Sequence, residues 1–183
     1  MSLIKIKSIL SFSSEDTTSK SENIINRSGK WIGSKSGDTK QFIKIELSEP
    51  SLIKQIDIEN ESSAFIEILV GNLNYLDEDF EVLLQATSFM SPNESKNSLN
   101  TNRLKIFTHE TDLDEKLAEK KWEVIKIVCT QPFNTNLQFG ISSLKFYDGI
   151  VNEASREAAK INTGIFSLKK EVSSSEKTTE SEF

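Results

Sequence analysis

Cysteine and histidine are almost absent from this chain of 183 residues, which contains one of each, Cys129 and His109. A single cysteine cannot form an intramolecular disulfide, which favours an intracellular protein, and Cys129 is expected to be a small core residue. The two side chains lie in different contexts, so neither a zinc site nor a thiol-protease site can be assembled, and His109 is predicted to be a solvated loop residue. Walker-type glycine loops and dinucleotide fingerprints are also absent. We therefore expect no enzyme, no metal and no cofactor.

An excess of positive charge and long apolar runs are both lacking. The net charge of −6 and the pI near 5.0 argue against a general nucleic-acid binder, although a local basic patch could still operate. No run approaches the length of a membrane span. The segment Met1–Leu10 alternates isoleucine with lysine, which is typical of a strand and not of a signal peptide. We expect a soluble protein.

The chain does contain many short runs with strand character, separated by turn-rich segments. They lie near residues 3–10, 41–48, 53–59, 64–71, 79–87, 102–107, 123–130 and 141–147. About eight such strands fit a β-sandwich, and 36% hydrophobic residues suffice for one core of about 150 residues. We predict a β-sandwich interaction domain over residues 1–148 and a flexible, largely disordered polar tail or linker over 149–183.

Two helical turns are predicted between the strands. In the first, Ser91 can cap the helix, Pro92 suits the first helical position, and Glu94 can complete a capping box. The second spans Thr111–Lys121, and its first residue has capping-box spacing to Asp114. Its short apolar stripe is expected to cover one end of the sandwich.

The run over residues 64–70 is apolar on both sides apart from one carboxylate. One side is uniformly apolar and consists of Ala64, Ile66, Ile68 and Val70. The other side carries Phe65, Glu67 and Leu69, and the carboxylate of Glu67 indicates that this side faces solvent. Large apolar groups on a solvent face predict a docking surface. The alternative is that a helix or a second sheet covers this face, which would make Phe65 an ordinary core residue.

Six blocks in the chain resemble the N-terminal domain of the X-ray repair cross-complementing scaffold protein of DNA single-strand-break repair. The resemblance covers roughly residues 1 to 148. In order, the blocks are SSAFIEILVG, DFEVLL, TSFMSPNESK, NRLKIF, AEKKWEVIKIVCTQPF and FGISSLKF. No block is a catalytic fingerprint, but six of them in the same order make chance similarity improbable.

The resemblance implies an all-β, jelly-roll-like fold of the galactose-binding type with one or two short helices. It also implies a nuclear, non-catalytic scaffold module that binds the catalytic domain of DNA polymerase beta and has some affinity for gapped or nicked DNA. The polymerase surface carried over from the family consists of Phe65, Glu67, Val82 and Lys105, and we add Leu69 from the same strand face. A monomer is expected.

Two positions depart from the family pattern. Lys105 stands where relatives carry arginine, and a lysine cannot grip a carboxylate with a planar fork, so a contact of that geometry should be weaker here. Phe12 and Lys20 stand where some relatives carry a redox-active cysteine pair. A disulfide switch is therefore excluded.

The alternation of side chains between the two faces of a strand makes a separate prediction for two of these residues. In the run over residues 102–107, Lys105 alternates with Leu104 and Ile106 and is expected to point outward. In the run over residues 79–87, the position of Glu81 would turn Val82 inward, so that only a bulge or a strand end could expose it.

The segment from Arg27 to Lys40 is the best candidate for binding nucleic acid. Arg27, Lys30 and Lys35 could hold phosphates, and Trp31 could stack on an unpaired base of gapped or nicked DNA. The alternative is that Trp31 anchors the loop in the sandwich while the basic residues are merely solvated. A carbohydrate-binding sandwich that uses its end loops is a weaker alternative.

The acidic run Asp77, Glu78, Asp79 precedes the strand that contains Val82. It is expected to be a solvated turn that could steer a basic partner toward Phe65. Calcium binding is the less favoured interpretation, because an isolated run of three acids in a loop is usually solvated.

Overall fold

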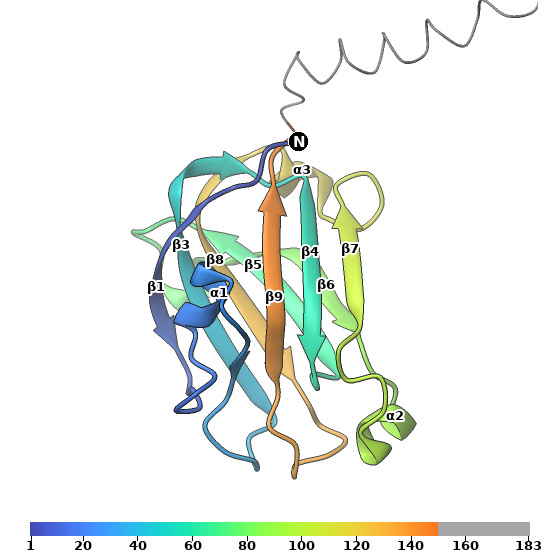
Figure 1. Cartoon of the computed structure of the whole chain (residues 1–183). Coiled ribbons are helices and arrows are strands. Elements are labelled where there is room, and N and C mark those ends of the chain that lie inside the picture. Colours follow the sequence, from blue (N-terminus) through green and yellow to red (C-terminus); the bar gives the residue numbers. More distant parts are fainter. Residues whose placement is uncertain (150–183) are drawn as a thin grey trace, which may run out of the picture. The chain divides into compact units, whose positions relative to one another are not determined.

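The computed structural model describes residues 1–149, so the predicted tail lies outside the described residues except for its first position. The described strands form two antiparallel sheets that pack face to face (Figure 1). The five-stranded sheet has the order β1 (Ile6–Phe12), β3 (Lys40–Leu52), β8 (Lys121–Thr130), β5 (Phe65–Gly71) and β6 (Glu81–Ser88). The four-stranded sheet has the order β2 (Trp31–Ile32), β9 (Gly140–Tyr147), β4 (Gln55–Glu61) and β7 (Leu104–Thr108). The predicted all-β sandwich is confirmed.

The strands form because their side chains alternate between core and solvent. Along β4 and β5 every second residue is buried, as a pleated strand with one face on a core requires. The core between the sheets is filled by large apolar side chains, the largest of which are Trp31, Trp122, Phe89, Phe139 and Phe146. All eight predicted strands are present with shifted ends, and the short strand β2 was missed because two residues are too few for an alternation to be visible.

The helices within residues 1–149 are short: α1 (Glu22–Asn26), α2 (Pro92–Asn97), α3 (Glu115–Ala118) and a 3₁₀ turn (Asp77–Asp79). None of them has the length and apolar character needed to cross a membrane. The capping box predicted for α2 is present, with Ser91 Oγ accepting from the Glu94 amide at 3.2 Å and Glu94 Oε2 accepting from the Ser91 amide at 2.7 Å.

The second predicted helix is shorter than expected. Residues 108–112 form a turn in which Asp112 accepts from the Thr108 amide and the Thr111 hydroxyl, so the chain is not yet helical at the predicted cap. Asp114 caps α3 instead, by accepting from the Leu117 amide at 3.0 Å. The hydrogen bonds of the Asp112 side chain thus form a turn where the first helical turn was predicted.

Cys129 and His109, the two scarce side chains, have different environments. Cys129 is fully buried in β8, and burial raises the pKa of its thiol to about 12, in accordance with the predicted core role. His109 is half-buried, and its Nδ1 atom has no hydrogen-bond partner among the described residues. The predicted loop position of His109 is confirmed, since it lies in a turn, but its side chain is half-buried and not simply solvated.

Glu94 makes the fold sensitive to acid. The Ser91 amide, then Asn100 and Arg103, donate hydrogen bonds to its carboxylate and lower its pKa to about 2. Because the ordinary value is near 4.3 in the unfolded chain, this contribution to stability is complete above about pH 4.3 and is lost as the pH falls toward 2. We expect Glu94→Gln to be less stable than the wild type in urea at pH 7, and the difference to shrink steadily between about pH 5 and 2.

The control for this titration is Glu110→Gln, which changes an exposed carboxylate. It should leave the pH dependence of unfolding unchanged. A constant difference between wild type and Glu94→Gln from pH 7 to 2 would contradict the assigned role of Glu94.

Candidate functional site

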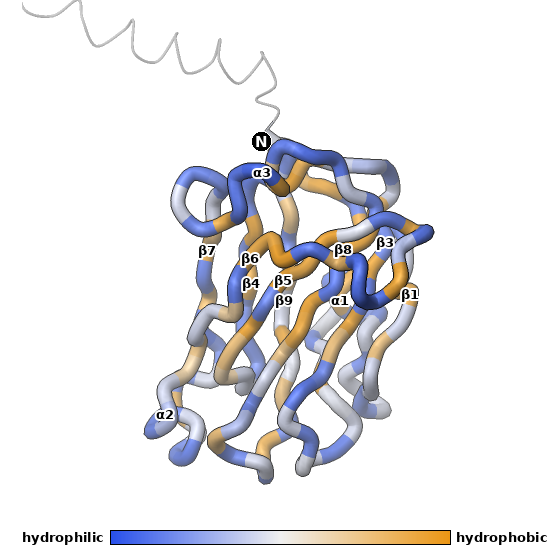
Figure 2. Tube along the Cα trace, turned by 180° about the vertical axis from the view of Figure 1, so that it is seen from behind, coloured by the Kyte–Doolittle hydropathy of each residue, from blue (hydrophilic) through white to orange (hydrophobic). Residues whose placement is uncertain are grey.

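The outer face of β5 is exposed on the side of the sandwich away from the second sheet. Ile66 and Ile68 are fully buried toward the four-stranded sheet, whereas Phe65, Glu67 and Leu69 are half-buried on the opposite face. Figure 2 turns this five-stranded sheet toward the viewer, and its neighbouring strands β8, β5 and β6 carry hydrophobic stretches. Within residues 1–149 no second sheet lies on this side and Phe65 is only half-buried, so the interpretation of Phe65 as an ordinary core residue is not supported.

Phe65 has one neighbour that holds its ring in place. Its ring centroid lies 5.8 Å from that of Phe133 in the segment after β8, with the rings tilted by 56°. This is the spacing of a favourable aromatic pair, so the ring is oriented before any partner arrives. A rigid, partly exposed aromatic side chain is the usual anchor of a protein interface.

Glu67 lies between two apolar side chains on this face. In register it lies opposite Val128 of β8, which is almost fully buried. Its carboxylate makes no ion pair and no side-chain hydrogen bond with any residue in the described part of the chain. The charge is therefore available to a cationic or N–H group of a partner.

Val82 lies on the same outer face, so the prediction from parity was wrong. The register pairs Val82 with Leu69 and Leu84 with Ile68, which leaves Leu83 as an extra residue in β6. Both Leu83 and Leu84 are buried. This irregularity reverses the alternation in β6 and brings Val82 beside Leu69 on the solvent side, as a β-bulge does.

Lys105 lies at the rim of this face, although it does not point outward from its own sheet as predicted. It shares the inner side of β7 with Phe107, which is only 5% exposed. From there its Nζ donates to the Ser88 carbonyl at 2.7 Å and lies 5.3 Å from the centroid of the Phe89 ring. Because Ser88 pairs with Phe65, the long side chain bridges from the second sheet to the edge of the candidate site.

Two outward side chains of β7 were missed as a possible surface. Leu104 and Ile106 are 59% and 55% exposed, and they flank Lys105 along the strand. The alternation in NRLKIF contained this signal, but it was assigned the opposite sense because a charged side chain is normally the outward one. The length of the lysine side chain reversed that expectation.

The acidic turn folds back over the centre of the same sheet face. Asp77 accepts hydrogen bonds from Lys44 and from Lys126, the latter at 3.0 Å, and these contacts lower the pKa of its carboxyl. Lys44 in turn lies 5.1 Å from the centroid of the Phe80 ring. Within residues 1–149 no three metal-ligating side chains converge, so calcium binding has no support. Because Lys44 and Lys126 offset the negative charge of Asp77, the turn offers less net charge for steering a basic partner than predicted.

The residues predicted to bind DNA do not form one surface. Trp31 is fully buried in β2, and its Nε1 donates to the Ser14 carbonyl at 3.1 Å, so the predicted stacking on a base is wrong and Trp31 anchors the loop. Lys30 is held by Glu61 at 2.8 Å. Of the predicted basic patch, only Arg27 and Lys35 remain exposed without an ion-pair partner among the described residues.

Comparisons with known proteins agree with this architecture. The family model of the XRCC1 N-terminal domain matches residues 1–146. The rat DNA repair protein XRCC1 is 37% identical over 150 residues, which cover 79% of this chain and 24% of the rat protein. The chain thus spans about a quarter of the length of this relative.

Solved structures show the same fold. A crystal structure of reduced XRCC1 bound to the DNA polymerase beta catalytic domain matches with a TM-score of 0.79 and 36% identity, over 81% of this chain and all of that chain. A chitosan-binding module of a Paenibacillus chitosanase/glucanase matches with a TM-score of 0.55 over 77% of this chain and 94% of that chain. At 12% identity, this second match shows a shared sandwich fold alone.

Proposed function

The chain belongs to the XRCC1 N-terminal domain family, and on this premise we propose that it is a non-catalytic scaffold module of DNA single-strand-break repair that binds the catalytic domain of a DNA polymerase beta. The observation that carries the proposal is the outer face of the five-stranded sheet. There, Phe65 and Leu69 flank Glu67, whose carboxylate has no partner among residues 1–149, and Val82 lies beside Leu69. The related XRCC1 structure, solved in complex with that polymerase domain, supports the choice of partner.

The arrangement has the features of a protein interface with a central anchor. Apolar side chains exclude water around Phe65, and the charge of Glu67, which has no partner in the described part of the chain, can select a partner of opposite charge. Lys105 contributes a positive charge at the rim, about one strand away from Glu67. A partner surface with an apolar pocket, a cation and a rim carboxylate would be complementary to it.

The proposal is tested by calorimetric titration of the chain with the catalytic domain of the polymerase beta of its own organism. We expect one-to-one binding with a negative heat-capacity change, because apolar surface is buried. No binding at any temperature would refute the docking role. The scaffold needs no catalytic chemistry of its own, and we place it in the nucleus as a monomer.

Lys105→Arg should strengthen binding to the polymerase domain. A guanidinium can make one more charge-assisted hydrogen bond to a carboxylate than an ammonium held at the same rim, which is worth about 1.5 kcal/mol or about tenfold in affinity. The titration described above measures this gain. Lys96→Arg, an equal change in the last turn of α2, should leave the affinity as it is.

The alternative function, a sensor of gapped or nicked DNA, now depends on Arg27, Lys30 and Lys35 without an aromatic side chain. It predicts that Lys30→Glu combined with Lys35→Glu abolishes binding to gapped DNA, and that the wild-type affinity falls steeply with salt. The same double variant should bind the polymerase domain normally, because both residues lie outside the Phe65 face.

A further inference from the structure

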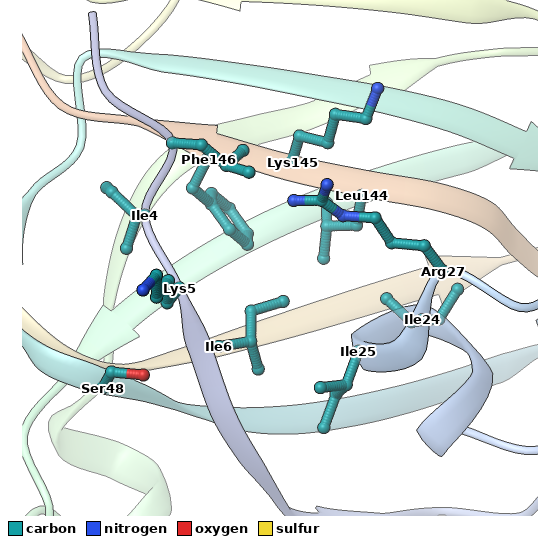
Figure 3. Close-up of a pocket in the computed structure, with 11 residues that line it drawn as sticks. Ile4, Lys5, Ile6, Ile24, Ile25, Arg27, Ser48, Leu144, Lys145 and Phe146 are labelled. Carbon is teal, nitrogen blue, oxygen red and sulfur yellow. The ribbon is translucent and has the colours of Figure 1, made fainter.

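A pocket lies at the seam between the sheets that is opposite to Lys105. It is formed by β1, α1 and β9 (Figure 3), whereas Lys105 lies at the seam of β6 and β7. Its volume is about 220 Å³. An apolar cavity of about 150 Å³ is large enough for benzene, so this pocket can take a ring or a short aliphatic chain.

The floor of the pocket is apolar. It consists of Ile4, Ile6, Ile24, Leu144 and Phe146, of which all but Ile6 are buried members of the core. A ligand that reaches this floor would remove apolar surface from water at no cost in protein hydrogen bonds. The floor therefore selects for an apolar group.

The rim of the pocket is cationic. Lys5, Arg27 and Lys145 line it, and no acidic side chain does. None of these three residues forms an ion pair with any described residue, although Lys7, two residues from Lys5, is paired with Glu46 at 2.7 Å. The rim therefore has three positive charges that have no direct ion-pair partner in the described part of the chain.

The nearest acid in register makes no direct ion pair with the rim. Asp57 of β4 pairs with Lys145 across the sheet, but its carboxylate accepts a hydrogen bond from Gln55 Nε2 at 2.7 Å and makes no ion pair with Lys145. Asp57 and Lys145 thus form no ion pair, and the ammonium group of Lys145 can contact a ligand at the rim.

Arg27 is placed at the rim by an unusual backbone conformation. It ends α1 in the left-handed region, with φ 52° and ψ 34°, where glycine or asparagine is the common residue. Figure 3 shows its side chain crossing from α1 toward β9, where Leu144 and Lys145 lie. A second hollow of about 300 Å³, lined by Ser142 and Ser143, adjoins the same two cations. Arg27 and Lys145 thus stand where an apolar and a hydroxyl-lined compartment meet.

We propose that this pocket binds an amphipathic organic anion, with its short apolar tail on the Leu144–Phe146 floor and its acidic head between Arg27 and Lys145. A planar guanidinium beside an ammonium suits either a carboxylate or a phosphate monoester. The tail distinguishes such a ligand from a free inorganic anion, and the head distinguishes it from a neutral apolar compound. This pocket shares no lining residue with the Phe65 face.

The test is a solution NMR titration of the isotope-labelled chain with hexanoate, hexyl phosphate, hexylammonium and acetate. We expect hexanoate or hexyl phosphate to shift the amide signals of Ile4, Leu144 and Lys145, with a Kd of about 1 mM for so small a ligand. Acetate and hexylammonium should bind at least about tenfold more weakly, because each lacks one half of the recognised chemistry. The tighter of the two anions identifies the head group.

Variants connect the binding to the cations. Arg27→Asn, which keeps a residue that tolerates the left-handed conformation, and Lys145→Gln should each weaken binding about tenfold. Lys7→Gln is the matched control on β1 and should bind as the wild type does. Thermal unfolding of all variants verifies that they fold. Equal binding of hexylammonium and hexanoate, no shift with either anion, or full binding by Arg27→Asn and Lys145→Gln would each overturn the proposal.

Discussion

Phe65→Ala is expected to weaken binding of the chain to the polymerase beta catalytic domain about thirtyfold while the sandwich stays folded. A central aromatic anchor is worth about 2 kcal/mol or more when it is truncated, which is about thirtyfold in Kd. The fold tolerates the change because Phe65 is half-buried on the outer face, and the contact that it loses is the one with Phe133. Calorimetry on wild type and variant measures the difference.

Phe12→Ala is the matched control for this measurement. Phe12 is 41% exposed at the end of β1, at the far edge of the same sheet, and its register partner is the inward-facing Ile43. The two variants therefore remove the same kind of side chain from different parts of the molecule. The control should retain wild-type affinity. Equal losses in both variants would mean that binding does not centre on Phe65, and unfolding of Phe65→Ala would mean that the residue acts as core.

Trp31→Ala is expected to have the largest effect on stability, lowering the free energy of unfolding by about 3–5 kcal/mol. The side chain is fully buried, and its removal would leave both a large cavity and an unpaired Ser14 carbonyl. Since small domains have about 5–15 kcal/mol in total, the variant should unfold at much lower urea concentration. Chemical denaturation monitored by circular dichroism measures the loss.

Trp31→Phe separates the two causes of this loss. Phenylalanine keeps most of the apolar contact but cannot donate to Ser14, so a smaller loss, of about 1–2 kcal/mol, is expected. The burial also predicts that gapped DNA leaves the fluorescence of Trp31 unquenched. Quenching, or a Trp31→Ala variant as stable as the wild type, would restore the stacking interpretation.

Local patterns in the sequence were sufficient for much of the fold. The alternation over residues 64–70 predicted which side of β5 is core, and the spacing of Ser91 and Glu94 predicted the cap of α2. Both signals act over two to four residues, where backbone geometry alone relates side chains to one another. The six sequence blocks that resemble the family, and their order along the chain, were also enough to predict the family.

Predictions that needed the position of a side chain across strands were less reliable. Strand alternation alone turned Val82 inward, because the extra residue in β6 depends on pairing with β5, whereas the resemblance had placed Val82 on the outer face. Alternation also turned Lys105 outward, although its stem crosses from one sheet to the other. Trp31 belongs to a loop in which the sequence has no period, so its burial depends on contact with distant residues such as Ser14.

The sequence by itself determined the class of fold, the inner faces of its longer strands and the helix cap at Ser91, because these follow from local periodicity and spacing. The family was indicated by the resemblance of six sequence blocks. Only the tertiary structure decided which side chains share a surface. It placed Val82 beside Leu69, tied Lys105 to the rim near Phe65, and closed a cationic pocket between β1, α1 and β9. The physical reason is that bulges, side-chain reach and the packing of remote segments depend on neighbours that are far apart along the chain.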